Sequence, residues 1–266
     1  MKQQMQAEVL WNDALGADFY RLGLRCQGDL SMARPGQFIM LQTARELDPL
    51  LKRPFSIHRL IQGNPPAMME ILYKAVGRGT RRMRTLIPGA ALEILGPLGR
   101  GFKVAQGLDL IFLAAGGIGV APMGFLVDFL LARGYAPGQL QLFLGARSRD
   151  ELKCADDFRR QGLTVRLSTD DGSAGDQCLI TDPLADAVRD TEPDLLLACG
   201  PTPMLACVIG IAEAHGLDCQ VSVEAHMACG VGACLGCALP TASQEPPYVH
   251  VCLNGPVFPA RQVKIA

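Results

Sequence analysis

The chain has 266 residues and a formal net charge of −1, and 49% of its residues are hydrophobic while 19% are charged. This length is enough for two or three domains whose buried cores need no disulfides. A nearly neutral chain without basic runs excludes nucleic acid as the main partner. Residues 1–20 lack the apolar stretch and the cleavage site of a secretory signal, so we expect a cytoplasmic protein.

The first hundred residues contain short apolar or alternating runs between Gly and Pro turns. In residues 21–26, Leu22, Leu24 and Cys26 alternate with arginine and glycine, as in a strand with one buried face. Similar runs follow at 36–41, 69–76 and 91–95. The pattern predicts a small antiparallel β-barrel or sandwich over residues 1–103.

From about residue 108, apolar runs alternate with helical patterns, which is typical of a parallel sheet covered on both faces. Pro122 and Gly134 are suited to the start and the end of the first helix. The pattern predicts a doubly wound α/β domain over 104–218 and then a small C-terminal lobe over 219–266. The expected strands are 108–115, 140–145, 163–168, 194–200 and 219–223, and the expected helices are 121–134, 149–162, 182–190 and 202–216.

The most apolar stretch, residues 110–132, is long enough to suggest a membrane span. Two adjacent glycines, Pro122 and Asp128 interrupt it. We therefore interpret it as a strand, a turn and a helix, and expect no membrane-spanning segment.

Ten cysteines are present, and four of them gather near the C-terminus. Cys229, Cys234 and Cys237 have the spacing C-x4-C-x2-C, and Cys252 follows. The other six stand singly among apolar residues, and in a reducing compartment we interpret them as core residues rather than as a disulfide framework. These six are Cys26, Cys154, Cys178, Cys199, Cys207 and Cys219.

The spacing of the four C-terminal cysteines is the plant-type arrangement for a [2Fe–2S] cluster. Four thiolates must converge on two irons, and a loop of small residues lets the backbone curl around the cluster and point amides at its sulfurs. Zinc is the alternative, although zinc sites more often contain two C-x2-C pairs or cysteine with histidine. We interpret His226 as structural, since four cysteines suffice. The small loop residues are Gly230, Gly232, Ala233 and Gly236.

The segment Arg53 to Ile57, R-P-F-S-I, is a weak motif whose plain interpretation is a strand start with a surface arginine. It gains weight from the later segments 72–80 and 95–102, which contain the pair Gly79 and Thr80. Arginine offers a forked cation to a diphosphate, and a glycine-threonine turn allows close backbone approach to a phosphate.

Two glycine turns follow buried strands of the α/β domain, at 114–122 (A-A-G-G-I-G-V-A-P) and at 198–204 (A-C-G-P-T-P-M). Such turns let a pyrophosphate approach a helix N-terminus, although glycine turns also join many strands to helices without a ligand. Cys199 is either pocket lining or core. Arg147, Ser148 and Arg149 follow the middle strand as a solvated loop or as contacts to the adenosine end of a dinucleotide.

In chain order, R-P-F-S, the Gly-Thr turn, G-P-L-G, G-G-I-G-V-A-P, C-G-P-T-P-M and the four cysteines resemble the ferredoxin reductase superfamily. Within it, residues 224–237 are similar to the electron-transfer subunits of NAD-dependent dihydroorotate dehydrogenase B. The resemblance covers essentially the whole chain, and its most specific part is this tail. It implies a multidomain β plus α/β protein with an FAD-binding barrel, an NAD-binding domain and a [2Fe–2S] lobe.

The resemblance also assigns residues. Lys74 departs from the family, which often has arginine there, so a compact ammonium charge replaces the forked guanidinium group of arginine. The arginines after Gly145 leave the choice between NAD and NADP open. The flavin residues would be Arg53, Pro54, Phe55, Ser56, Leu72, Tyr73, Lys74, Gly79 and Thr80, and the NAD residues Gly116, Gly117, Gly119, Cys199, Gly200 and Pro201.

The implied activity is a relay without a catalytic acid or base, because every motif serves a nucleotide or the cluster. Nicotinamide exchanges two electrons and the cluster takes one at a time, so FAD must stand between them. The resemblance implies that electrons pass from the FMN of a TIM-barrel dihydroorotate dehydrogenase catalytic subunit, through the cluster and FAD, to NAD in pyrimidine biosynthesis. It also implies a heterotetramer with two copies of each subunit.

Two other hypotheses remain open. One is a related subunit that connects NAD(P)H to ferredoxin, as in a transhydrogenase or a sulfide dehydrogenase-like complex. The other is a zinc-stabilised interaction module on a degenerate reductase scaffold. Partner identity separates the first from the relay, and bound metal and colour separate the second.

Overall fold

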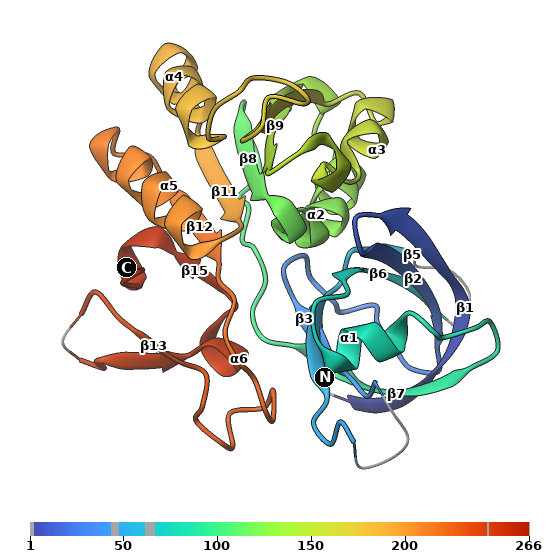
Figure 1. Cartoon of the computed structure of the whole chain (residues 1–266). Coiled ribbons are helices and arrows are strands. Elements are labelled where there is room, and N and C mark those ends of the chain that lie inside the picture. The colour runs from blue at the N-terminus through green and yellow to red at the C-terminus, as the bar shows by residue number, and fades with distance from the viewer. Residues whose placement is uncertain (1–2, 44–47, 62–66, 244, 266) are drawn as a thin grey trace.

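The structure, a computed structural model, describes residues 3–43, 48–61, 67–243 and 245–265. It contains a seven-stranded sheet, a six-stranded sheet and a two-stranded hairpin. In Figure 1 the seven-stranded sheet (blue to teal) lies below the six-stranded one (green to orange), and the C-terminal segment (red) lies beside both.

The N-terminal sheet is antiparallel and curled, which confirms the predicted barrel architecture. Its strand order is β4-β3-β7-β1-β2-β6-β5. One helix, α1 (Arg78–Met83), follows β6. The strands are β1 (Gln3–Gly16), β2 (Phe19–Cys26), β3 (Phe38–Leu41), β4 (Arg53–Ser56), β5 (Arg59–Ile61), β6 (Ala67–Lys74) and β7 (Ala91–Leu98).

The second sheet has the order β10-β9-β8-β11-β12-β15, with its first five strands parallel. This confirms the predicted doubly wound architecture. The strands are β8 (Ile111–Gly116), β9 (Leu140–Ala146), β10 (Thr164–Thr169), β11 (Leu195–Cys199), β12 (Cys219–Ser222) and β15 (Val257–Pro259), and the helices are α2 (Ala121–Ala132), α3 (Ala155–Arg160), α4 (Thr181–Thr191) and α5 (Thr202–Ala214).

Alternate residues of β8 pack on opposite faces of this sheet, as the side-chain period of a strand requires. Phe112 and Ala114 pack with residues of α4 and α5, whereas Ile111 and Leu113 pack with residues of α2 and α3. Because both faces are covered, the central strands β8 and β11 are apolar and fully buried, as the sequence indicated.

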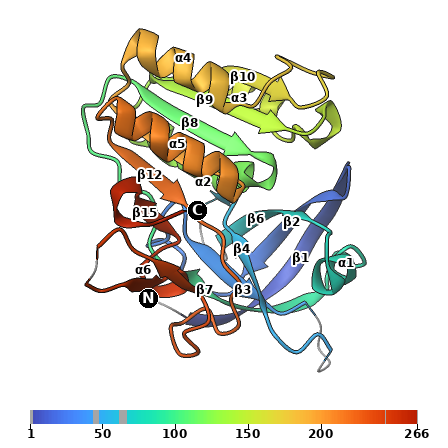
Figure 2. The ribbon, with the colours of Figure 1, turned by 60° about the vertical axis from the view of Figure 1, so that its left-hand side comes forward.

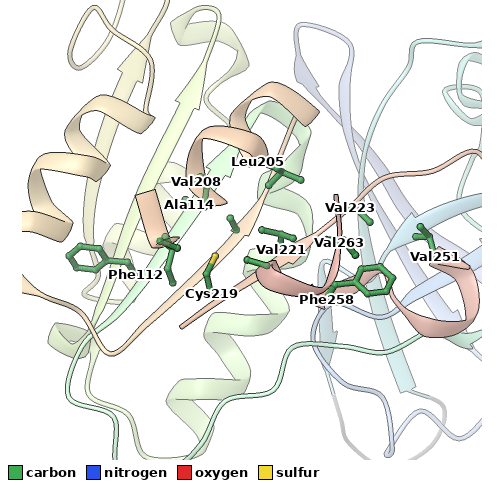
Figure 3. Packing of buried hydrophobic residues seen from close by; sticks show 14 of the residues in the cluster. Phe112, Ala114, Leu205, Val208, Cys219, Val221, Val223, Val251, Phe258 and Val263 are labelled. Atoms are coloured by element: carbon green, nitrogen blue, oxygen red, sulfur yellow. The ribbon is translucent and has the colours of Figure 1, made fainter. Parts of the chain in front are cut away.

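The C-terminal segment returns to the parallel sheet. Its strand β15 pairs antiparallel with β12, and it also forms the hairpin β13 (Ala238–Pro240) and β14 (Tyr248–His250) and the short helix α6 (Val251–Asn254). Figure 3 shows Val251 and Phe258 near Val221 and Val223 in one continuous core. In Figure 2 this segment runs beside both sheets.

The predicted helix over 149–162 is wrong in its first half. Residues Arg149–Glu151 form a 3-10 turn, and Cys154 adopts a left-handed backbone with φ of 65°, so α3 begins only at Ala155. The long first strand β1 and the helix α1 were not predicted. None of the helices within the described residues is long and apolar enough to cross a membrane.

Candidate functional site

A cavity of about 450 Å³ lies between the two sheets, where β4, β6, the start of α2 and residues 222–227 meet. Most of the predicted flavin residues line it. Those that do are Pro54, Phe55, Ser56, Leu72, Tyr73, Lys74 and Thr80, and the opposite wall consists of Ile118, Ala121, Pro122, Cys199, Ser222, Val223, Glu224, Ala225 and Met227.

The two remaining predicted flavin residues, Arg53 and Gly79, lie against each other beside this cavity. A Cβ on Gly79 would be 3.3 Å from Nε of Arg53 and 3.2 Å from Oγ1 of Thr43. The Thr43 side chain is buried, and its hydroxyl has no hydrogen-bond partner among the described residues. A hydroxyl and a guanidinium around a close backbone approach fit a phosphate group.

The turn after β6 is held by a side chain. The hydroxyl oxygen of Thr80 accepts hydrogen bonds from the backbone amides of Val76 and Gly77, each at 3.0 Å. Thr80 thereby fixes the turn that borders the cavity. Thr43 was not singled out from the sequence, because a lone threonine after a strand carries no local signal.

A second cavity, of about 600 Å³, lies at the C-terminal ends of β8, β9, β10 and β11, where open α/β sheets bind ligands. Gly116, Gly117, Gly200 and Pro201, which belong to the two glycine turns, line it. Gly119 does not. Its missing side chain instead allows close packing on the carbonyl of Cys199, which faces the first cavity.

Arg147 also lines the second cavity, whereas Ser148 and Arg149 do not. Arg149 is bound to Ser173, through its backbone amide at 2.7 Å from Oγ and its Nε at 2.9 Å from the carbonyl oxygen. The buried hydroxyl of Ser168 faces this cavity and has no partner among the described residues. A polar ligand in this cavity therefore has a free hydroxyl available to it.

The two cavities share one wall, made by Lys74, Val76, Ile118 and Glu224. Lys74 donates to Glu151 at 2.6 Å, so its charge is already paired. Glu224 is exposed to the open cavities, yet desolvation by the surrounding wall raises the pKa of its carboxyl group. Burial, together with Glu224, also raises the pKa of the Cys199 thiol to about 12. Glu224 was not predicted as a site residue.

The four C-terminal cysteines form two pairs. The Sγ atoms of Cys237 and Cys252 lie 3.2 Å apart in a buried position. Cys229 and Cys234 form the other pair, in which the backbone amide of Cys234 donates to the sulfur of Cys229 at 3.4 Å. This is the grouping that two irons need, each with two thiolates.

Backbone amides point at these sulfurs. The amides of Val231 and Cys234 donate to Cys229 and lower the pKa of its thiol to about 6. The amide of Cys252 donates to Cys237 at 3.4 Å. Burial and the neighbouring Cys237 raise the pKa of the Cys252 thiol to about 12.

A single tetrahedral ion fits this arrangement poorly. Within the described part of the chain, no three His, Cys, Asp or Glu side chains are placed to hold one metal ion together. Structural zinc needs four ligands around one point, whereas two separate thiol pairs with amide donors match a two-iron cluster. The donor set therefore fits a [2Fe–2S] cluster better than zinc.

Two family models match the chain. Residues 224–264 match the iron-sulfur cluster binding domain of dihydroorotate dehydrogenase B, and residues 113–209 match an oxidoreductase NAD-binding domain. The first match contains all four paired cysteines, and the second contains both glycine turns.

The chain is also similar to solved structures under 25% identical, which show the fold alone. An NADH-dependent reduced ferredoxin-NADP oxidoreductase has a TM-score of 0.83 and 23% identity, with 97% of this chain and 90% of that chain covered. A ferredoxin NADP+ reductase from Neisseria gonorrhoeae with bound FAD and NADP has a TM-score of 0.67 and 14% identity, with 80% and 92% covered.

Curated relatives match over nearly the full length. The dihydroorotate dehydrogenase B (NAD(+)) electron transfer subunit of Caldanaerobacter subterraneus subsp. tengcongensis is 33% identical over 264 residues, 99% of both chains. That of Geobacillus kaustophilus is 36% identical over 247 residues, 92% of both chains. The chain belongs to the family of dihydroorotate dehydrogenase B (NAD(+)) electron transfer subunits.

Proposed function

We propose that this chain passes electrons from the FMN of a dihydroorotate-oxidising partner, through a [2Fe–2S] cluster and FAD, to NAD in the synthesis of UMP. The observation that carries the proposal is continuity: residues 222–227 line the first cavity and run directly into the paired cysteines that begin at Cys229. The first cavity in turn shares a wall with the second. The proposed cluster site, FAD site and NAD site would thus follow one another in the order of electron transfer.

The first cavity is the proposed FAD site. Phe55 and Tyr73 offer aromatic surfaces on one wall, with their ring centroids 6.1 Å apart. Thr43, Arg53 and Gly79 would hold a phosphate beside it, as the unpartnered hydroxyl of Thr43 supports. When bound, FAD exchanges a hydride with nicotinamide and single electrons with an iron-sulfur cluster.

The second cavity is the proposed NAD site. The backbone at Gly116, Gly117, Gly200 and Pro201 would approach the pyrophosphate, because these turns present small residues at strand ends. Glu224 and Lys74 stand at the shared wall, where the nicotinamide and the flavin would meet. Their role would be to position the two rings and to exclude water from between them.

Cys229, Cys234, Cys237 and Cys252 are the proposed cluster ligands. Their grouping into two pairs and the amides that donate to their sulfurs support this. Hydrogen bonds from amides favour the thiolate form that binds metal.

The relatives are named as subunits, so a catalytic dihydroorotate dehydrogenase B subunit is the expected partner. We propose that it is an FMN-containing TIM barrel and that two copies of each chain form a heterotetramer. We also propose three domains, at 1–103, 104–218 and 219–266. The cytoplasm is the proposed compartment, since none of the ten cysteines, all of which lie within the described residues, forms a disulfide.

A second candidate function is electron transfer between NADH and ferredoxin. It is favoured by the TM-score of 0.83 to an NADH-dependent reduced ferredoxin-NADP oxidoreductase. The two functions differ in their partner. Co-purification with an FMN TIM-barrel protein supports the first, and co-purification with a larger FAD and [4Fe–4S] subunit supports the second.

The proposal is tested by mixing the chain with its partner. NAD reduction by dihydroorotate is expected only when both subunits are present. Oxidation of dihydroorotate with NAD by the isolated chain would contradict this division of labour.

A further inference from the structure

A fully buried histidine joins the curled sheet to the nucleotide-binding domain. His58 lies between β4 and β5, and its side chain is 0% exposed. Its backbone amide donates to the carbonyl of Glu70 in β6 at 2.9 Å. Two residues earlier, Ser56 ends β4 and lines the first cavity. The backbone of His58 is thus fixed to both strands that form one wall of that cavity.

The ring of His58 contacts the opposite wall. Its Nδ1 lies 2.7 Å from the carbonyl oxygen of Ala121, the first residue of α2. A carbonyl oxygen only accepts, so Nδ1 carries the proton and Nε2, 3.8 Å from Sγ of Cys154, is the acceptor of the neutral ring. Ala121 and Pro122 both line the first cavity. One side chain therefore connects its two walls.

Gly124 allows α2 to come this close. A Cβ there would lie 2.6 Å from the carbonyl oxygen of His58, and 2.8 Å and 2.9 Å from Cε1 and Nδ1 of its ring. Glycine inside a helix is less favourable than alanine. Its presence at this crossing shows that close contact between α2 and His58 outweighs helix propensity.

Two other polar contacts between the domains lie farther along the helices α2 and α3. Arg59 donates to both carboxylate oxygens of Asp128 at 3.1 Å, in the second half of α2. Arg21 pairs with Asp157 of α3 at 2.5 Å. Neither pair touches the first turn of α2, so they provide controls for general weakening of the domain contact.

We propose that His58 is a positioning residue that sets the first turn of α2, and with it the wall formed by Ala121 and Pro122, against the flavin. The inference rests on the assignment of the first cavity to FAD. The buried hydrogen bond of His58 fixes the position of the first turn of α2 and so keeps that wall at one distance from the flavin ring. This distance determines the polarity and the water content around the flavin.

The test uses the whole purified chain with its natural flavin. His58→Leu removes the donor at similar size, whereas His58→Asn keeps an N–H near the position of Nδ1. Gly124→Ala places a methyl group of α2 against His58 and so pushes the helix away from it. This variant replaces His58→Leu in the test if His58→Leu does not fold. Arg59→Met is the control, because it weakens the domain contact without touching Ala121.

Two readouts are measured: the visible absorption and circular dichroism of the flavin, and hydrogen exchange of residues 117–125. His58→Leu and Gly124→Ala should shift the flavin bands and speed amide exchange in 117–125 by about tenfold or more. His58→Asn should resemble the wild type, and Arg59→Met should leave both readouts unchanged.

The inference is overturned if His58→Leu and Gly124→Ala keep wild-type spectra and exchange, if His58→Asn fails to restore them, or if Arg59→Met changes both as strongly. A wild-type chain that binds no flavin would contradict the proposed function instead. Hydrogen exchange of 117–125 would still decide the role of His58 in that case.

Discussion

The sulfur atoms of Cys237 and Cys252 lie 3.2 Å apart, although 15 positions separate these residues in the chain. The hairpin formed by β13 and β14 turns the backbone so that α6 presents Cys252 to the end of the cysteine loop. Cys237 is 3% exposed and Cys252 is 1% exposed, so this pair anchors the site from its buried side. Cys234, by contrast, is exposed.

Replacing Cys252 with serine should remove most of the iron but leave the flavin bound. Loss of a hydrogen bond that supports a metal ligand lowers metal affinity roughly 10–100-fold, and loss of the ligand itself should lower it at least as much. NAD reduction by dihydroorotate in the complex should fall accordingly, while NADH-ferricyanide activity persists. Cys207 was expected in the core but is exposed on α5, where it lines the second cavity, so it is the control for iron content: Cys207→Ser should retain full iron. Iron retained in Cys252→Ser would contradict the ligand assignment.

Lys74 should govern the affinity for NADH through its ion pair with Glu151. Lys74→Met leaves that carboxylate unpaired at the edge of the second cavity, where it repels a pyrophosphate. We expect KM for NADH to rise about tenfold, which equals about 1.4 kcal/mol, and the rise to shrink at high salt. Lys153→Met is the control, since Lys153 donates to the carbonyl of Leu15 and lines neither cavity. Equal KM values in both variants would refute this role.

Stability should depend on pH through His58. Burial, together with the positive charges of Arg21 and Arg59, lowers its pKa from 6.5 to about 4, although the hydrogen bond with Ala121 and the charge of Asp157 act to raise it. Between these pH values the unfolded chain binds a proton that the folded chain does not. The free energy of unfolding should therefore fall as pH drops from 6.5 to 4, by roughly 3 kcal/mol, and the contribution should be constant above 6.5.

The measurement is urea unfolding of the wild type and of His58→Asn across this range. The difference between the two chains isolates the contribution of the histidine from that of the carboxylates. Parallel curves for the two chains would mean that His58 titrates normally in the folded state.

How much of this site could be read from the sequence depends on distance along the chain. The cysteine spacing and the glycine turns are local patterns, so Cys229, Gly116 and Gly200 could be singled out from the sequence, and the structure places Gly116 and Gly200 at one cavity. Glu224 and Thr43 became visible only when the two sheets came together, because their neighbours lie far away in the sequence.

The same distinction between local patterns and long-range contacts explains which elements of the fold could be predicted. Strands and helices with regular apolar periods, such as β8 and α2, were predicted within a few residues. The helix expected over 149–162 was not, because the left-handed backbone at Cys154 is stabilised by tertiary contacts with Arg21 and His58. The pairing of β15 with β12 is likewise a long-range contact that periodicity does not encode.

Glu224 should make electron exchange between nicotinamide and flavin depend on pH. Its pKa is raised by desolvation, so the protonated form persists above the usual range of a glutamate. Glu224→Gln mimics that form. At low pH the rate of flavin reduction by NADH should be the same in Glu224→Gln and in the wild type. At higher pH the wild-type rate should change as Glu224 loses its proton, whereas the rate of Glu224→Gln should stay constant. Stopped-flow traces across pH check this, with the exposed Glu213→Gln of α5 as the control.

Two glycines should respond in opposite directions to alanine. At Gly119 a methyl group would overlap the carbonyl of Cys199, so the two strand ends must move apart. We expect a loss of roughly 2–3 kcal/mol in the free energy of unfolding. At Gly210, inside α5, nothing lies within 4 Å, and alanine should add about 0.5–1 kcal/mol. Equal stabilities would refute the close packing of the 3-10 turn Gly117–Val120 on the end of β11.

The central claim is that one chain holds a flavin and a two-iron cluster side by side. An anaerobic visible spectrum of the purified chain, with iron, acid-labile sulfide, zinc and flavin quantified in the same sample, tests it most directly. We expect about two irons, two sulfides and one FAD per chain, the content of a [2Fe–2S] flavoprotein. A colourless chain that contains zinc instead would contradict it, and the paired cysteines would then be a structural clip.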